Sequence, residues 1–406
     1  MISIFHPNGK LEGEVDLPAS KSISNRLLIL QAQYPKIEIE NLSEAEDTVL
    51  LHKALKQKSS TIDVNHAGSS LRFLTAYFAF KAGCKVVLTG SKRLQQRPIK
   101  ILVDSLKSLG AKITYQEKEG FAPLIIEGVK PPNFGEVTID ASTSSQFVTA
   151  LLLMAGNFKE GLKLQLKNQI VSASYIELTL ALLSKFGFET KIEGNEIFAK
   201  FQSFKTKKFI VENDWSAASF FLSMACLSSD SNLLLRGLKE SDLQGDKSQV
   251  ALFEQLGTNF YFEKRGLRLK SAKSSINNFD CNLLQMPDVT QALAVTLAKK
   301  NIKANISALQ TLPSKETNRI EALKTELQKF GKTINTSKTS INISGEFNQN
   351  PIATIETYHD HRMAMAFAAL GLIQKLNIID EEVVSKSFPN YWKVLKSLGF
   401  VIDITS

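Results

Sequence analysis

The 406-residue chain is 43% hydrophobic and 22% charged, which is typical of a globular protein with two or three ordinary domains. Its formal net charge of +9 would suit an acidic partner, but the lysines are scattered singly and no DNA- or RNA-binding motif of the usual kinds occurs. Small anions are therefore favoured over nucleic acid as ligands.

Membrane and metal chemistry are not indicated either. No run of about 18 apolar residues occurs and the N-terminal stretch lacks a signal-peptide pattern, so we expect a cytoplasmic protein that does not bind membranes. Cys84, Cys226 and Cys281 lack the short spacing of a metal or redox motif, and we expect them to be buried structural thiols. His359 and His361 cannot both face one ion from a helix. We predict no metal and no cofactor.

One pattern recurs five times: an amphipathic helix, a Gly able to take the left-handed conformation, and an alternating strand. The closing glycines lie 77, 70, 74 and 68 positions apart, so a unit of roughly 70 residues is reused. Counting back one more period reaches residues 51–64, which have a helix and a strand without the Gly, and six α/β units are predicted. The five copies span residues 106–113, 183–190, 253–260, 327–334 and 395–402.

The first segment with recognisable chemistry is LPASKSISNRLLIL at residues 17–30. It predicts a proline-containing turn and then a helix that starts near Ser22 or Ile23. Lys21 and Ser22 would lie at the helix N-terminus and Arg26 one turn inside, an arrangement that suits an anion. The alternative is a surface capping turn.

Three more segments of the first half suit an anionic or polyol ligand. HAGSSLRFL at residues 66–74 again places small residues at a helix start, and Gly68 allows close backbone approach. Arg97 beside Pro98 suits bidentate binding of a carboxylate or phosphate, unless RLQQRPI is only a solvated loop. Residues 142–146 place four hydroxyls and the Gln146 amide at the head of an apolar helix, more than capping requires.

The second half adds charged groups at the starts of apolar helices. Asp288 in MPDVTQALAV would be kept ionised by the helix dipole and could take a proton from a hydroxyl, although its default role is an N-cap. The other groups are Lys315, Glu316 and Arg319, expected within one helical turn, Asp360, His361 and Arg362, expected at the head of a buried helix, and Lys386, beside another expected helix start.

Taken in order, these segments resemble the enolpyruvyl transferase family, specifically its branch that acts on shikimate 3-phosphate. SKSISNR is similar to SKS-x-SNR, AGSSLRFL to NAG-T-x-x-R, QQRPI to RERPI, KETNRI to KETDR and HDHRMAM to NDHRMAM, over about 370 residues. The branch that acts on UDP-N-acetylglucosamine usually carries a reactive Cys in the loop equivalent to residues 90–99, and this loop has none. A non-catalytic anion-binding protein on the same fold would not need Asp288 and Glu316.

The resemblance implies an α/β fold of two similar globular domains, each of three βαβαββ-type units with buried parallel helices. Residues 1–19 with 214–406 would form one domain and residues 20–213 the other, joined by crossover hinges near residues 13–20 and 210–216. It also implies transfer of the enolpyruvyl group of phosphoenolpyruvate to the 5-hydroxyl of shikimate 3-phosphate, with release of phosphate through a tetrahedral intermediate, in aromatic amino acid biosynthesis. These two substrates would be the partners, and we expect a monomer.

The resemblance further implies the residues of the site. Asp288 would be the base for the 5-hydroxyl, while Lys21 and Glu316 would move protons at the leaving phosphate and at C3, with roles that could be exchanged. The residues implied for shikimate 3-phosphate are Lys21, Ser22, Arg26, Ser144, Ser145, Gln146, Ser172, Tyr175, Asp288, Thr311 and Lys315. Those implied for phosphoenolpyruvate are Lys21, His66, Gly68, Arg97, Gln146, Arg319, Arg362 and Lys386.

Four positions depart from the family pattern. His66 and Thr311 stand where the family commonly has Asn, Ala19 replaces a Gly, and Asn318 replaces the Asp of KETDR. His66 and Thr311 are nevertheless kept among the implied contacts.

Overall fold

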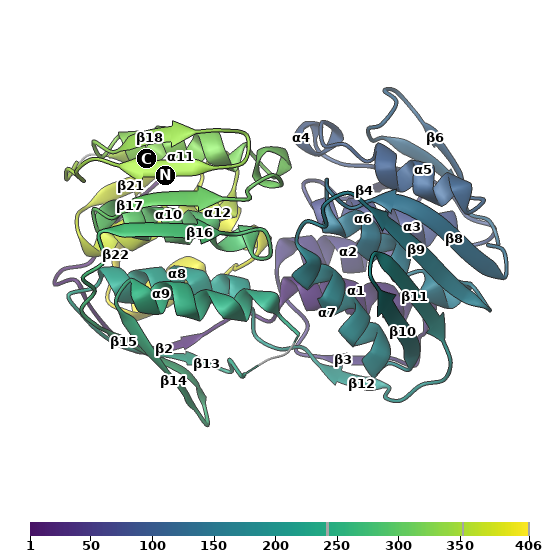
Figure 1. Ribbon diagram of the computed structural model, residues 1–406, viewed down its shortest axis with the longest axis horizontal. Coiled ribbons are helices and arrows are strands. Elements are labelled where there is room, and N and C mark those ends of the chain that lie inside the picture. Colours follow the sequence, from purple (N-terminus) through teal and green to yellow (C-terminus); the bar gives the residue numbers. More distant parts are fainter. Residues whose placement is uncertain (241–242, 351–352, 405–406) are drawn as a thin grey trace. The chain divides into compact units, whose positions relative to one another are not determined.

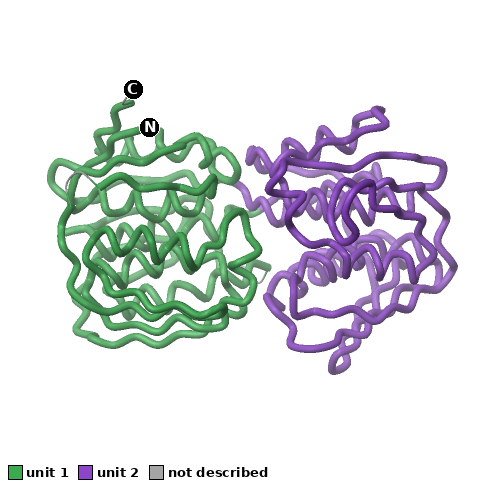
Figure 2. Tube along the Cα trace, turned by 90° about the horizontal axis from the view of Figure 1, so that it is seen from above, with its two compact units in different colours: residues 1–18, 212–406 green, residues 19–211 purple. Residues whose placement is uncertain are grey.

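The computed structural model describes residues 1–240, 243–350 and 353–404. The chain folds into two compact units, which Figure 2 shows in different colours. Unit 1 comprises residues 1–18 and 212–406, and unit 2 comprises residues 19–211. Each unit is described by itself.

A single strand order recurs in five four-stranded sheets of the described chain (Figure 1). In each sheet two strands pair in parallel, a third is antiparallel to the second, and the fourth is antiparallel to the third. Unit 2 contains β4 (Thr61–Asp63), β5 (Lys85–Thr89), β7 (Leu124–Glu127) and β6 (Lys112–Tyr115), and β8 (Phe134–Asp140), β9 (Gly161–Lys167), β11 (Glu196–Phe201) and β10 (Phe188–Glu193).

Unit 1 contains the other three sheets. In spatial order they are β2 (Lys10–Asp16), β13 (Asp230–Arg236), β15 (Gly266–Ser271) and β14 (Thr258–Glu263); β16 (Asn278–Asn282), β17 (Lys303–Ser307), β19 (Ile341–Ser344) and β18 (Thr333–Thr336); and β20 (Thr354–Ile355), β21 (Leu376–Ile378), β1 (Ile2–Phe5) and β22 (Val401–Ile404). The last sheet takes its third strand from the N-terminus of the chain.

The five helix–Gly–strand copies predicted from sequence form the same part of each sheet. Each glycine follows a helix, has φ between 77° and 101°, and precedes the outermost antiparallel strand. Only a residue without Cβ takes this conformation at little cost, which explains the recurring Gly. The helices are α5 (Lys100–Ser108), α7 (Ala173–Lys185), α9 (Val250–Gln255), α11 (Arg319–Gln328) and α13 (Tyr391–Ser397).

The sixth unit differs from the segment assigned to it. Residues 51–64 do contain part of α2 (Glu46–Lys56) and β4, but β4 is the parallel edge strand that opens the next sheet and is not equivalent to the strands after the glycines. The sixth sheet of the described chain is instead the parallel pair β3 (Glu38–Glu40) and β12 (Lys208–Ile210).

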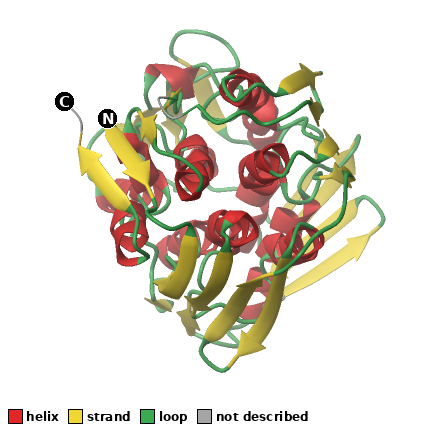
Figure 3. Cartoon of the chain, turned by 90° about the vertical axis from the view of Figure 1, so that its left-hand side faces the viewer, coloured by secondary structure: helices red, strands yellow, loops and turns green. Residues whose placement is uncertain are grey.

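Helices fill the interior of each unit, because several carry no polar face. α8 (Trp215–Leu227) is apolar on nearly every side and almost wholly buried in unit 1, together with α10 (Thr290–Lys299) and α12 (His361–Ala368). Figure 3, in which unit 1 faces the viewer, shows these helices in the middle and strands around them. In unit 2 the buried helices are α3 (Gly68–Ala79) and α6 (Ser145–Leu152), accompanied by α1 (Lys21–Gln33) and the short α4 (Lys92–Gln95).

The cysteines are less uniformly buried than expected. Cys226 is buried in α8, and burial raises the pKa of its thiol to about 12, whereas Cys84 and Cys281 are half-buried. All three are free thiols. Within the described ranges, no helix has the length and apolar character needed to cross a membrane.

The packing of α8 predicts a large loss on truncation of Phe221. Its side chain is fully buried and its ring contacts the rings of Phe388 and Tyr391. Phe221→Ala should lower the free energy of unfolding by about 3–5 kcal/mol in urea denaturation, because it removes a large apolar group and leaves a cavity. The matched control, Phe134→Ala, removes a ring that is 40% exposed and should cost about 1 kcal/mol or less. Equal losses would contradict an interior formed by these helices.

Candidate active site

The candidate residues of unit 2 begin at the N-terminus of α1. The helix starts at Lys21, one or two residues earlier than predicted, because Ser20 is its N-cap and accepts from the Ile23 N–H at 3.5 Å. Lys21 and Ser22 are therefore the first two helical residues, where backbone N–H groups have no partner within the helix. An anion at this end would meet both the helix dipole and an ammonium group.

Arg26, one turn further along α1, is a buried cation surrounded by neutral acceptors. Its guanidinium donates to the Thr179 hydroxyl at 2.8 Å and to the carbonyls of Ser22 and Tyr175. Burial lowers the pKa of Arg26 to about 9, since desolvation is not offset by a carboxylate. A cation in this environment is stabilised by an anionic ligand.

Two more guanidinium groups meet at the start of α3. Arg72 donates to the Gly68 carbonyl at 2.8 Å, and both Arg72 and Arg97 are buried. A Cβ added at Gly68 would lie 2.5 Å from Nη1 of Arg97 and 2.9 Å from Nη1 of Arg72. Gly68 is therefore required by the close approach of two cations to the backbone, and two like charges this close favour an anion beside them.

Lys21 belongs to a charged cluster that the sequence did not predict. Its Nζ lies 2.9 Å from Oδ2 of Asp47, in the first turn of α2. Nε2 of His66 lies 3.8 Å from the other oxygen of Asp47 and 3.5 Å from Oε2 of Glu46. Neither Glu46 nor Asp47 was predicted from the sequence as part of the site.

The hydroxyl-rich segment lies at the start of α6. Ser144 is its N-cap and accepts from the Gln146 N–H at 3.3 Å, while the Ser142 hydroxyl donates to Asp140 at 2.6 Å. Ser145 is buried in the first turn. Of the residues implied for the same ligand, Ser172 is the N-cap residue of α7 in the left-handed conformation, and Tyr175 follows in the first turn of α7. α6 and α7 pack against each other within unit 2.

The candidate residues of unit 1 lie around Asp288. This residue lies in a 3₁₀ turn (Pro287–Val289) directly before α10, but its side chain does not cap the helix as its default role predicted. Its carboxylate lies 2.9 Å from Nη2 of Arg362, 3.0 Å from Nη1 of Arg319 and 3.6 Å from Nζ of Lys315. Burial alone would raise the pKa of Asp288, but Arg362, Lys315 and Arg319 together hold it well below its usual value.

Arg319 connects this cluster to its surroundings. Its side chain is 2% exposed, and it pairs with Asp360 at 2.7 Å and with Glu316 at 2.9 Å as well as with Asp288. Burial would lower the pKa of Arg319, but Asp360, Glu316 and Asp288 raise it above its ordinary value. Lys315 and Glu316 are not helical, because α11 begins only at Arg319 with Asn318 as its N-cap, so the prediction of one helical turn was wrong for them.

The head of α12 was predicted correctly. Asp360 is its N-cap and accepts from the Arg362 N–H at 2.9 Å, which fixes the position from which Arg362 reaches Asp288. Lys386 was predicted beside a helix start but ends a short 3₁₀ helix (Glu381–Lys386), and its ammonium donates to the His359 carbonyl at 2.6 Å. The Thr311 side chain is nearly buried, and its hydroxyl has no hydrogen-bond partner among the residues that the structure describes.

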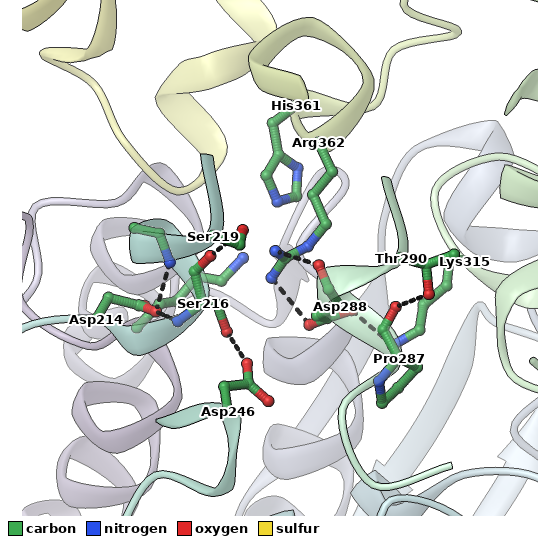
Figure 4. Close-up of polar contacts among 12 residues, drawn as sticks. Asp214, Ser216, Ser219, Asp246, Pro287, Asp288, Thr290, Lys315, His361 and Arg362 are labelled. Atoms are coloured by element: carbon green, nitrogen blue, oxygen red, sulfur yellow. Dashed lines mark hydrogen bonds and ion pairs between the residues drawn. The ribbon is translucent and has the colours of Figure 1, made fainter. Parts of the chain in front are cut away.

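Asp246 is a further acid in this region whose role the sequence did not predict. It receives a short hydrogen bond from the Ser216 hydroxyl at the start of α8, and Figure 4 shows it below Ser216, with Arg362 and Asp288 to the right. Burial raises the pKa of Asp246 to about 6, and the nearby charge of Asp288 raises it further against the Ser216 hydrogen bond and Arg362.

Comparison with known proteins identifies the family. The profile described as EPSP synthase (3-phosphoshikimate 1-carboxyvinyltransferase) matches residues 36–395. A 3-phosphoshikimate 1-carboxyvinyltransferase of Bacteroides fragilis is 41% identical over 97% of both chains, and one of Sulfurovum is 34% identical over 96% of this chain and 97% of its own. The chain belongs to the EPSP synthase family. It is a transferase of the shikimate pathway, in aromatic amino acid biosynthesis.

Solved structures agree with this family in fold. EPSP synthase of Acinetobacter baumannii superposes with a TM-score of 0.76 at 21% identity, covering 99% of both chains. The enolpyruvyl transferase NikO of Streptomyces tendae superposes with a TM-score of 0.72 at 13% identity, covering 100% of this chain and 98% of its own. The mixed α/β enolpyruvyl transferase fold expected from sequence is thereby confirmed.

The raised pKa of Asp246 predicts a pH-dependent difference in stability. Because the folded pKa is about 6 and the ordinary value is 3.8, the folded protein binds more protons than the unfolded chain between these values, and stability is lost as pH rises through 6. Asp246→Asn keeps an acceptor for Ser216 but not the charge. When the pH is raised from about 5 to about 8, the free energy of unfolding of Asp246→Asn should rise by about 1–2 kcal/mol relative to that of the wild type. Asp230→Asn, at an exposed carboxylate, is the control and should show no such gain. A constant difference between wild type and Asp246→Asn would contradict the assignment.

Proposed function

We infer that the charged groups described above carry out the family reaction, in which the 5-hydroxyl of shikimate 3-phosphate adds to C2 of phosphoenolpyruvate, C3 is protonated, and phosphate then leaves the tetrahedral intermediate as C3 loses a proton. Each substrate brings a phosphate and a carboxylate, so placing them together costs several kcal/mol of like-charge repulsion where the dielectric constant is low. The cations and helix N-termini described above offset that repulsion.

The observation that carries this proposal is the pairing of Asp288 with Lys315, Arg319 and Arg362. A carboxylate held by three cations is a weak base, because its negative charge is already stabilised. The same cations are those implied for the substrates. When the anionic groups of the substrates take Arg362 and Lys315, Asp288 loses part of its stabilisation and becomes a better acceptor for the 5-hydroxyl proton.

Lys21 and Glu316 supply the remaining proton transfers in this proposal. Lys21, at the N-terminus of α1, would hold or protonate the phosphate oxygen that leaves. Glu316, which accepts from Arg319 at 2.9 Å, would handle the proton at C3. These roles remain exchangeable, as inferred from sequence.

The binding roles follow the position of each group. Arg26, Ser144, Ser145, Gln146, Ser172 and Tyr175 would contact shikimate 3-phosphate with Ser22, Thr311 and Lys315. The neutral surroundings of Arg26 and the unpartnered Thr311 hydroxyl support contacts with a polar anion. Arg97, Gly68, His66, Arg319, Arg362 and Lys386 would contact phosphoenolpyruvate, and the two guanidinium groups against Gly68 support an anion there.

The direct test is phosphate release. Purified protein with shikimate 3-phosphate and phosphoenolpyruvate should release one phosphate per enolpyruvyl group transferred, and no phosphate when either substrate is omitted. UDP-N-acetylglucosamine should not replace shikimate 3-phosphate in this reaction. Shikimate 3-phosphate should raise the melting temperature of the protein, and UDP-N-acetylglucosamine should not. Turnover with the nucleotide sugar would move the chain to the other branch of the enolpyruvyl transferases.

Replacing the proposed base should separate chemistry from binding. Asp288→Ala should lower kcat by about two orders of magnitude or more, because the 5-hydroxyl loses its proton acceptor, while both substrates still shift the melting temperature. Asp280→Ala removes an exposed carboxylate of the same unit and should leave kcat unchanged. Near-normal turnover in Asp288→Ala would remove Asp288 from the mechanism.

A further inference from the structure

His66 lies in unit 2 among carboxylates and cations that come from four elements. Glu46 and Asp47 face its Nε2 from α2 at 3.5 Å and 3.8 Å, and Lys21 from α1 holds the other oxygen of Asp47 at 2.9 Å. Gly68 lies two residues along the chain from His66. The guanidinium groups of Arg72, on α3, and Arg97, in the segment after α4, approach this glycine. The two arginines are thus the cations nearest to the backbone of Gly68.

The charge on His66 changes the balance of this cluster. When the imidazole is neutral, the charged groups beside it are the Lys21 ammonium and the carboxylates of Glu46 and Asp47. With an imidazolium, two cations face the same two carboxylates, and the ring competes with Lys21 for Asp47. The ammonium of Lys21 is then held less tightly by the protein and is more available to an anionic ligand.

Bound anion and bound proton should therefore favour each other. Without an anion, Arg72 and Arg97 oppose a positive charge on His66, while Glu46 and Asp47 favour it. An anion bound beside the two arginines neutralises the opposing charges, so it makes protonation of the ring more favourable. By reciprocity, protonation strengthens binding of the anion by the same factor.

We propose that His66 is a proton-linked binding residue for phosphoenolpyruvate, which binds more tightly when the imidazole is protonated. The proposal deepens the proposed function, because it relies on phosphoenolpyruvate binding beside Gly68. An uncharged residue such as Asn at this position, which the family commonly has, cannot provide the linkage. The pH dependence of substrate affinity is then a property of this chain's own sequence.

The kinetic test compares wild type, His66→Asn and His52→Asn at saturating shikimate 3-phosphate. His52 lies on α2 but outside the cluster, so its replacement is the matched control. Phosphoenolpyruvate itself titrates near neutral pH, and this contribution is common to all three proteins. From about pH 6 to pH 8, KM for phosphoenolpyruvate should rise roughly five- to tenfold more in wild type and His52→Asn than in His66→Asn, with similar changes in kcat.

A second measurement does not depend on turnover. The sequence has five histidines, and the ring signal of His66 is identified in NMR spectra by its absence from His66→Asn. Its titration midpoint should move to higher pH when phosphoenolpyruvate alone is added. Parallel KM profiles in wild type and His66→Asn, or a midpoint that does not move, would overturn the proposal. A wild type without phosphate release would instead overturn the proposed function, and the NMR titration would still decide the role of His66.

Discussion

The buried guanidinium of Arg319 is the interaction on which the charged half of unit 1 depends. It contacts Asp288, Glu316 and Asp360, which come from three segments far apart in the sequence. Removing one partner from such a cluster leaves buried charge without compensation, so the segments are held in one arrangement. Asp360 also caps α12 and thereby positions Arg362. Arg319 therefore helps to fix both Asp288, the proposed base, and Arg362, which pairs with Asp288. The structural network and the proposed chemistry use the same contacts.

The repeated sheet explains why the charged groups gather at helix starts. Each buried helix has too little polar surface to face water, so its charged residues are confined to its ends. Helix N-termini also carry partial positive charge and unpaired N–H groups, which favour anions. The start of α1 in unit 2 and the starts of α10 and α12 in unit 1 all follow this rule. Cations at these ends add to the backbone contribution.

Much of this organisation could be predicted from sequence, because it depends on local patterns. The closing glycines predicted five of the sheets, and apolar helices headed by Lys21, Asp360 or the serines before Gln146 predicted the site segments. Contacts between distant segments could not be predicted: Asp47 with Lys21 and Ser216 with Asp246 depend on how helices pack. Residues 315–318 were misassigned because the spacings of Lys315 and Glu316 from Arg319, four and three residues, suit a helix and also suit a turn that packs against Arg319. The reduced sixth sheet was missed because residues 51–64 match the pattern without forming the same strand.

The central claim is that the substrates take over cations that hold Asp288 in their absence, and so raise its basicity. The most direct test is carboxyl ¹³C NMR of the aspartates, with the Asp288 signal identified by its loss in Asp288→Asn. The titration midpoint of Asp288 should lie well below the ordinary value in the free protein. It should rise by about one pH unit or more when shikimate 3-phosphate and a non-reacting phosphonate analogue of phosphoenolpyruvate are bound. A midpoint that stays equally low with both ligands bound would contradict the account.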